Sequence, residues 1–364
     1  MSGTEQVQVN EALKQVQDPY LKTDLVSAGI VKSISNDAGK LVIELVFPYA
    51  CQGIEAALRE QVAAALQAIE CDAGELKIAQ QIEPHQGQNQ LANMAQVKNI
   101  IAVASGKGGV GKSTTAVNLA LAMAAEGARV GIMDADIYGP SLGLMLGVPA
   151  GQHPEPVGEN AMRPINALGL QSMSIAYMVD ENTPMVWRGP MVSGALQQLL
   201  TQTIWDDLDY LFIDMPPGTG DIQLTLSQKV PVAGSVVVTT PQDIALLDAR
   251  KGIEMFQKVG IPVLGVVENM STHICTNCGH TEHIFGEGGG NRISTQYDTE
   301  LLGNLPLSLT IREQVDAGKP TVVADPEGEV AQVYREIARK VAASLVLRDL
   351  QRPAQVPNIV IEND

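Results

Sequence analysis

The stretch Gly106-Lys107-Gly108-Gly109-Val110-Gly111-Lys112-Ser113-Thr114 decides the fold of this chain. It fits the pattern G-x-x-x-x-G-K-[ST], in which glycines let successive backbone N–H groups turn toward one anion without a Cβ in the way. The apolar run 100–104 before it predicts a buried strand, and residues 115–125, rich in Ala, Leu and Met, predict a helix. Strand, loop and helix in this order predict a phosphate-binding site at the positive end of the helix.

Two lysines of this loop have different expected roles. Lys112 is expected on the β- and γ-phosphates of a nucleotide, and the hydroxyl of Ser113 beside it is expected on Mg²⁺. The side chain of Lys107 leaves the loop too early to share the role of Lys112. Residues 106–114 are therefore predicted to cradle a Mg-nucleotide, with Lys112 stabilising phosphate charge during hydrolysis.

The composition favours a two-domain protein with protein partners. The chain has 364 residues, of which 45% are hydrophobic, enough for more than one core. Its formal net charge of -17 argues against binding to nucleic acid or to an anionic membrane, since both attract a basic surface. No apolar run reaches the ~18 residues of a membrane span, and residues 1–10 show no signal-peptide pattern. We expect a cytoplasmic protein with neither nucleic acid nor membrane as partner.

Residues 1–83 predict a small α+β domain. The hydrophobic patterns and turn residues there indicate two helices and three strands, at 5–16, 54–69, 30–35, 41–47 and 76–82. Residues 84–97 are polar and lack a hydrophobic period, which predicts a linker. Cys51 and Cys71 are each expected to be packing residues rather than ligands.

Strands and helices alternate from residue 98 to residue 352, which we interpret as a second, larger domain. This alternation predicts an α/β fold with a mostly parallel sheet of the P-loop NTPase kind, covered by helices on both faces. Apolar residues at helical spacing over 329–349 predict a packed terminal helix. Residues 353–364 are expected to form a loose C-terminal tail.

Acidic residues follow two of the predicted strands. Asp134 and Asp136 come after the strand 128–133, and Asp214 ends the strand 210–214. The carboxyl ends of parallel strands meet at one edge, so these side chains should converge on the phosphate loop. Asp214 with Ser113 is then a candidate Mg²⁺ site, and Asp136 can orient the attacking water, with helix capping as its structural alternative. The glycine-hinged loop 216–221 is a candidate nucleotide-sensing switch.

A cysteine pair lies further along, in His273-Ile274-Cys275-Thr276-Asn277-Cys278. The C-x-x-C spacing lets two thiolates converge on one metal centre, but it leaves a four-ligand site half filled. Histidines such as His280 and His283 could complete a zinc site, a second copy of the chain could supply two more thiolates, or the pair could cycle as a dithiol. In a two-fold dimer, Cys275 and Cys278 of both chains can hold one [4Fe-4S] cluster.

Together these motifs resemble the Mrp/ApbC iron–sulfur cluster carriers, which belong to a class of ATPases with a deviant phosphate loop. The resemblance covers nearly the whole chain and rests on the loop with Lys107 and Lys112, the segments 134–141 and 215–221, and the Cys275-x-x-Cys278 pair. It implies an ATPase that closes as a homodimer over a bridging [4Fe-4S] cluster. It further implies protein partners that donate the cluster and apo-proteins that receive it.

The resemblance also implies roles for single residues. Lys107 is implied to reach the nucleotide of the partner chain, Asp136 to orient water, and Asn269 to bind the base of ATP. No N-K-x-D pattern follows Asn269, so the preference for ATP over GTP rests on the resemblance alone. The N-terminal domain resembles the MIP18-like domain of iron–sulfur assembly proteins, which implies that it docks donor or recipient proteins.

Two other classes of protein share part of this pattern. A positioning ATPase of the MinD/ParA kind has the same loop but needs a basic or amphipathic docking surface, and the acidic charge and the cysteine pair speak against it. The nitrogenase iron protein, an electron-donating reductase, also bridges a cluster across a dimer, but with cysteines from separated segments. The spacing in this chain favours the carrier.

Overall fold

In the computed structural model, the chain is described at residues 3–37, 40–71, 74–85, 92–178, 189–275 and 277–351. The expected tail at 353–364 and part of the expected linker lie outside the described residues.

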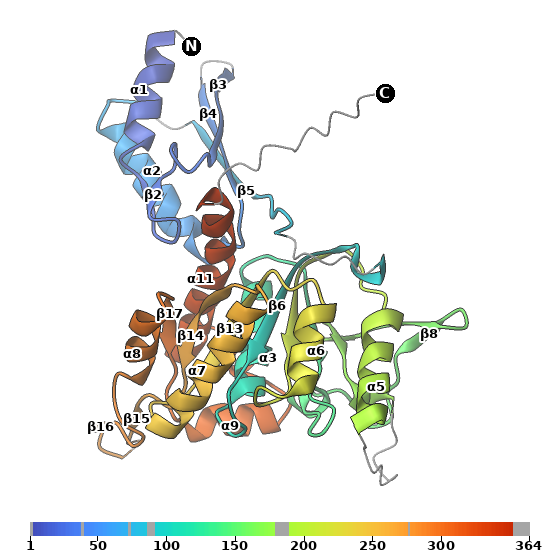
Figure 1. The fold of residues 1–364 in the computed structure, drawn as a ribbon. Coiled ribbons are helices and arrows are strands. Elements are labelled where there is room, and N and C mark those ends of the chain that lie inside the picture. Colours follow the sequence, from blue (N-terminus) through green and yellow to red (C-terminus); the bar gives the residue numbers. More distant parts are fainter. Residues whose placement is uncertain are drawn as a thin grey trace, which may run out of the picture.

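A large sheet forms the centre of the fold (Figure 1). Its strands are β6 (Val97–Ala104), β7 (Val130–Asp134), β10 (Ile165–Ala167), β11 (Leu170–Met173), β12 (Leu208–Asp214), β13 (Gly234–Thr239), β14 (Val263–Glu268) and β17 (Leu301–Asn304). Their order across the sheet is β10-β11-β7-β12-β6-β13-β14-β17, and only the β10–β11 pair is antiparallel. This confirms the mostly parallel sheet predicted from the sequence.

Helices cover both faces of this sheet, because neighbouring residues of each strand point to opposite sides. On β6, Ile101 and Val103 belong to one hydrophobic cluster, whereas Ile100 and Ala102 belong to another. The first cluster is completed by α3 (Lys112–Ala125), α4 (Leu142–Met145), α10 (Thr321–Ala324) and α11 (Glu329–Gln351). The second is completed by α5 (Gly189–Gln202), α6 (Asp221–Lys229), α7 (Asp243–Lys258) and α8 (Gly289–Gln296).

The N-terminal part forms a smaller α+β unit, as expected. Its three-stranded sheet contains β3 (Val31–Asp37), β4 (Lys40–Phe47) and β5 (Glu75–Gln80), and its helices are α1 (Gly3–Leu13) and α2 (Glu55–Gln67). Every second residue of β4 is buried, which is the period expected of a strand with one covered face. Those buried residues share a cluster with Leu58, Val62 and Leu66 of α2.

Several short elements escaped the sequence analysis. They are β1 (Gln17–Asp18), β2 (Thr23–Asp24), β8 (Glu155–Val157), β9 (Ala161–Arg163), β15 (His273–Ile274), β16 (Thr281–Glu282) and α9 (Leu309–Asp316), with 3-10 turns at Gln52–Ile54, Ala92–Met94 and Ile175–Tyr177. Strands of two or three residues are too short to show an alternation of apolar and polar side chains.

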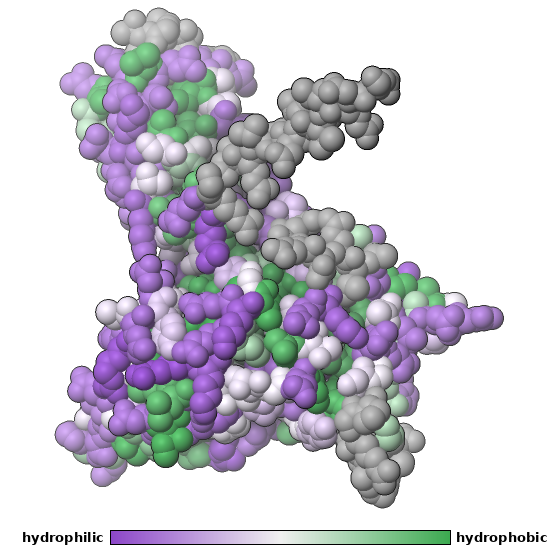
Figure 2. Space-filling view, viewed as in Figure 1, coloured by the Kyte–Doolittle hydropathy of each residue, from purple (hydrophilic) through white to green (hydrophobic). Residues whose placement is uncertain are grey.

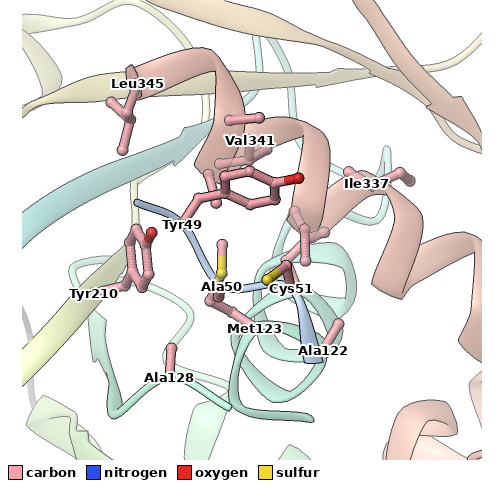
Figure 3. Close-up of a cluster of buried hydrophobic side chains, with 14 of the residues drawn as sticks. Tyr49, Ala50, Cys51, Ala122, Met123, Ala128, Tyr210, Ile337, Val341 and Leu345 are labelled. Carbon is pink, nitrogen blue, oxygen red and sulfur yellow. The ribbon is translucent and has the colours of Figure 1, made fainter. Parts of the chain in front are cut away.

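The two units are not separate bodies, because they share one hydrophobic cluster (Figure 3). Tyr49, Ala50 and Cys51 of the small unit are each 2% exposed or less. Figure 3 shows them among side chains of the larger unit, namely Ala122, Met123, Ala128, Tyr210, Ile337, Val341 and Leu345. Cys51 is therefore a packing residue, and burial raises the pKa of its thiol far above the ordinary range. A polar linker alone would not have indicated this joint core.

A buried carboxylate stabilises the same junction. Glu126 lies just beyond the end of α3 and is fully buried. Its carboxylate accepts hydrogen bonds from the backbone N–H of Gly53 at 2.7 Å, from Nε of Arg335 at 2.7 Å and from Nη1 of Arg339 at 2.6 Å. Arg339 also donates to the hydroxyl of Tyr20 and lies 5.5 Å from the centre of its ring. One acid thus links the small unit, α3 and α11.

Among the helices in the described part of the chain, none has the length and apolar character needed to cross a membrane.

Candidate functional site

The phosphate loop connects β6 to α3, as predicted, and two of its glycines are sterically required. Gly111 has a φ of 82° and is the N-cap residue of α3. A Cβ on Gly111 would lie 2.2 Å from Nδ2 of Asn269, and one on Gly106 would lie 2.1 Å from the backbone of Asp248 on α7. A larger residue at either position would displace the loop from the strand end and the helix that hold it.

The structure brings four of the predicted site residues together at the start of α3. Nζ of Lys112 lies 2.5 Å from Oδ1 of Asp214, 4.0 Å from Oδ2 of Asp136 and 3.1 Å from Oγ of Ser113. Lys112 is 6% exposed and Asp214 is fully buried, so their ion pair lies in a low-dielectric setting. Burial raises the pKa of Asp136, and the Lys112 ammonium opposes this rise.

The donors around Asp214 fit a hard divalent cation. Its second carboxylate oxygen, Oδ2, is buried and has no hydrogen-bond partner among the described residues, although buried carboxylate oxygens are normally satisfied. The hydroxyl of Ser113 lies next to Lys112 on the same side of the site. A carboxylate oxygen and a hydroxyl are the oxygen ligands that Mg²⁺ prefers. These residues therefore suit the role that the sequence suggested for them.

Asp134 is a site residue to which the sequence analysis gave no separate role. It is fully buried and accepts hydrogen bonds from the backbone N–H groups of Asp136, Ser141 and Leu142 at 2.9 to 3.2 Å. Asp134, rather than Asp136, thus caps the start of α4. Burial and the neighbouring Asp214 carboxylate raise the pKa of Asp134 to about 7. The spacing Asp-Ala-Asp was the available signal, since residues two apart on an extended segment point to the same side and can serve one site.

The loop after Asp214 lies against the end of β6, close to the phosphate loop. The backbone N–H of Met215 donates to the carbonyl of Val103 at 3.0 Å, and that of Gly218 donates to the carbonyl of Ser105 at 3.0 Å. Gly218 has a φ of 94°, a conformation that favours glycine. α6 then begins at Asp221. The candidate switch, residues 216–221, therefore lies beside the phosphate loop whose ligand it would sense.

Asn269 contacts the phosphate loop directly. Its Nδ2 donates to the carbonyl of Val110 at 2.9 Å, and its Oδ1 accepts from the backbone N–H of Met270 at 2.9 Å. The residue is 9% exposed. The structure thus assigns Asn269 a loop-holding contact, and its role in binding the base stays a prediction.

Lys107 is half-buried, and its Nζ lies 3.5 Å from Oε1 of Gln242, the N-cap residue of α7. This is a long contact for a charged donor, so it constrains Lys107 little. Its reach to the nucleotide of a second chain stays a prediction.

The cysteine pair lies on the hairpin formed by β15 and β16, beyond the end of β14. The backbone N–H of Cys275 donates to the carbonyl of His280 at 2.9 Å, and that of Gly279 donates to the carbonyl of Cys275 at 2.8 Å. Cys275 is half-buried and Cys278 is exposed. Hydrogen bonds from the backbone N–H groups of Cys278 and Asn277 lower the pKa of Cys275.

The described residues place no cluster of three or more His, Cys, Asp or Glu side chains where it could hold one metal ion. The zinc site that the nearby histidines could have completed is therefore not assembled among those residues. Two of the histidines have other partners, since Nδ1 of His273 donates to the carbonyl of Leu307 and Nδ1 of His283 donates to that of Ser271.

Exposed apolar side chains lie around the hairpin. Ile274 and Ile284 are each 52% exposed, and Ile244 and Leu247 at the start of α7 are 69% and 54% exposed. Figure 2 shows a green area over the start of α7 and the hairpin, at the lower left of the view. We call these four residues the apolar patch. Apolar surface of this kind beside polar residues is typical of a protein–protein contact.

Comparison with protein families gives two matches that together cover most of the chain. Residues 96–342 match the ParA family model, described as the NUBPL iron-transfer P-loop NTPase, and residues 6–75 match the model of an iron–sulfur cluster assembly protein domain. The resemblance stated from the sequence is thereby confirmed for both parts of the chain.

Individual relatives agree with these matches. The chain is 68% identical to the iron-sulfur cluster carrier protein of Pseudomonas fragi, over 71% of this chain and 90% of that one. It is 50% identical to the iron-sulfur cluster carrier protein of Haemophilus influenzae, over 98% of this chain and 96% of that one. Among solved structures, it resembles a nucleotide-binding protein of Archaeoglobus fulgidus in complex with ADP, with a TM-score of 0.55 and 35% identity over 65% of this chain and 92% of that one.

Proposed function

The chain belongs to the family of NUBPL iron-transfer P-loop NTPases, and from this premise we propose that it is a Mg-ATP-hydrolysing carrier of [4Fe-4S] clusters. Two copies would hold one cluster between them and transfer it to apo-proteins. The observation that supports the proposal is that the phosphate loop follows β6 and the cysteine pair follows β14 of the same parallel sheet, with Lys112 paired to Asp214, Cys275 half-buried and Cys278 exposed.

We assign each residue of the phosphate site a separate role in hydrolysis. Lys112 and the loop N–H groups neutralise charge on the phosphates, and Asp136 orients the attacking water. Ser113 and Asp214 would hold Mg²⁺, which when bound adds charge stabilisation at the phosphates. The pairing of Lys112 with Asp214 keeps both charges satisfied in a buried place, so the site is ready to exchange a carboxylate partner for a phosphate partner.

The cargo site needs a second copy of the chain to be complete. A [4Fe-4S] cluster takes four thiolates, and Cys275 with Cys278 supplies two. Identical residues meet across the axis of a two-fold dimer, so a second copy provides the other two. The apolar patch around the hairpin supplies surface for that contact (Figure 2). Lys107, on the same edge, is proposed to reach the nucleotide of the partner.

Anaerobic reconstitution with ferrous iron and sulfide tests this proposal. The native chain should gain visible absorption and about four irons per dimer, while Cys275→Ala and Cys278→Ala should not. Cys71→Ala is the matched control, because Cys71 is half-buried in the small unit and should not affect iron binding. Zinc in place of iron, or iron that survives both substitutions, would overturn the carrier assignment. A bound cluster that cycles its oxidation state and never leaves would indicate an electron donor instead.

The small unit is proposed to dock donor or recipient proteins, in line with the matching assembly domain. Deleting it would uncover Met123, Ile337 and Val341, so a deletion would confuse docking with folding (Figure 3). Substitutions on its exposed surface are the appropriate test, with cluster transfer to each recipient as the measurement.

A further inference from the structure

The cysteine hairpin is joined to the phosphate loop by a short connection that is buried where it begins. Only five residues lie between Asn269, which contacts the loop, and Cys275. Asn269 is 9% exposed and Ser271 is 5% exposed. Met270 between them has a φ of 57°, a conformation that a residue with a Cβ rarely adopts unless its surroundings impose it. This segment therefore has one well-defined path from the loop to the hairpin.

Hydrogen bonds fix both ends of this connection. At the loop, Nδ2 of Asn269 donates to the carbonyl of Val110 at 2.9 Å. At the hairpin, Nδ1 of His283 donates to the carbonyl of Ser271 at 3.0 Å. Both the N–H and the hydroxyl of Ser271 donate to the carbonyl of Leu305, at 3.0 and 3.1 Å. Because a carbonyl cannot donate, Nδ1 of His283 must carry the proton. A residue after the hairpin, His283, thus binds Ser271, which is two residues from the loop contact at Asn269.

A second contact runs along the start of α7. The backbone of Gly106 lies against Asp248 of α7, and Lys107 lies beside Gln242. On the other side, a guanidinium nitrogen of Arg292 lies 3.3 Å from a carboxylate oxygen of Asp243, in the first turn of the same helix. The phosphate loop and the segment after the hairpin therefore both contact the N-terminal part of α7, although through different residues.

We propose that the phosphate loop and the cysteine hairpin move as one coupled unit, with Asn269 and His283 as positioning residues. The proposal rests on the proposed function and adds a means of regulation to it. In the structure Lys112 lies on Asp214, and in the second arrangement that we propose it lies on the phosphate of a bound nucleotide. A nucleotide that favours the second arrangement shifts Val110, Asn269 and the hairpin with it, and so changes the presentation of the two thiols.

Thiol reactivity measures this coupling without any cluster. The reduced full chain carrying Cys71→Ala would be treated with N-ethylmaleimide, with and without saturating Mg-ATP or Mg-ADP, and mass spectrometry would follow Cys275 and Cys278. Cys51 is 2% exposed and should react slowly. Nucleotide should change the rate at Cys275 or Cys278 by at least about fivefold, the lower end of ordinary coupling between two sites.

If His283 is a positioning residue, its removal should abolish the effect of nucleotide on the reaction rate of the thiols. In His283→Ala the thiols should react at the same rate with and without nucleotide, although nucleotide affinity stays that of the native chain. Thr281→Ala is the matched control, an exposed position on β16, the strand that ends just before His283, and should keep the native response. A full response in His283→Ala would overturn the proposal, and so would native thiols that ignore a nucleotide shown to bind. The second result would leave the carrier function intact, whereas failure of the nucleotide to bind would remove both.

Discussion

Replacing Glu126 by alanine should destabilise the whole chain, because it leaves two arginines without their buried partner. Glu126 is fully buried, and the side chains of Arg335 and Arg339 are 17% and 10% exposed. Breaking a buried ion pair by removing one partner costs about 3–5 kcal/mol, since the other charge stays buried. The N–H of Gly53 also loses its acceptor. We expect a loss at the upper part of that range, measured as the free energy of unfolding in urea by circular dichroism.

A control and a second variant make this reasoning testable. Glu55→Ala removes a glutamate from an exposed pair with Arg59, and such a pair contributes only about 0–1 kcal/mol. The double variant Glu126→Leu/Arg339→Leu should lose less free energy of unfolding than the sum of the losses in the two single variants. The reason is that neither Glu126 nor Arg339 is then left buried without the other. If the free energy of unfolding of Glu126→Ala lies within about 1 kcal/mol of the native value, the junction depends on the apolar cluster alone and the argument fails.

Two further predictions concern the phosphate site. Lys112→Ala should lower the rate of ATP hydrolysis at least about a hundredfold, since one preorganised donor to a developing charge is lost. An assay of phosphate release measures this rate. An unchanged rate would mean that Lys112 takes no part in the reaction. Asp134→Asn should change how stability depends on pH. The pKa of Asp134 is about 7 in the fold and about 3.9 in an unfolded chain, so the folded state binds more protons between these values and loses stability as pH rises through them. Relative to the native chain, the variant should therefore melt higher at about pH 8 than at about pH 5, and a parallel shift at both would contradict the assigned cause.

The sequence predicted the sheet and the order of strand, phosphate loop and helix, because both depend on local patterns. The loop needs glycines at fixed spacing, and Asp214 had to end a buried strand for its carboxylate to face that loop. The structure adds the partners of these residues, such as the contact between Lys112 and Asp214. The sequence placed Asp214 near the loop but did not predict its pairing with Lys112, because the pairing of single side chains far apart in the chain leaves no periodic signal.

The junction of the two units shows a second limit. Tyr49, Ala50 and Cys51 are an ordinary apolar triplet in the sequence, and Glu126 is an ordinary acid near the end of a helix. Their importance arises only because α11, more than two hundred residues later, brings Arg335 and Arg339 to them. The polar segment at 84–97 predicted a linker between two domains, and the structure adds that residues of both domains share one hydrophobic cluster.

The position of the small unit constrains how it can assist cluster delivery. α3 starts at the phosphate loop and ends beside Glu126, so its fourteen residues place the junction about 21 Å from the loop. The small unit and the β15–β16 hairpin lie at opposite ends of the molecule in Figure 1. A protein docked on the small unit therefore does not reach the cysteines of the same chain unless it spans the full height of the sheet. The shared core and the Glu126 contacts oppose a rotation of the unit toward the hairpin. If the proposed docking role holds, a small recipient therefore has to dissociate from the small unit before it takes up the cluster, and only a recipient long enough to span the sheet can contact both places at once.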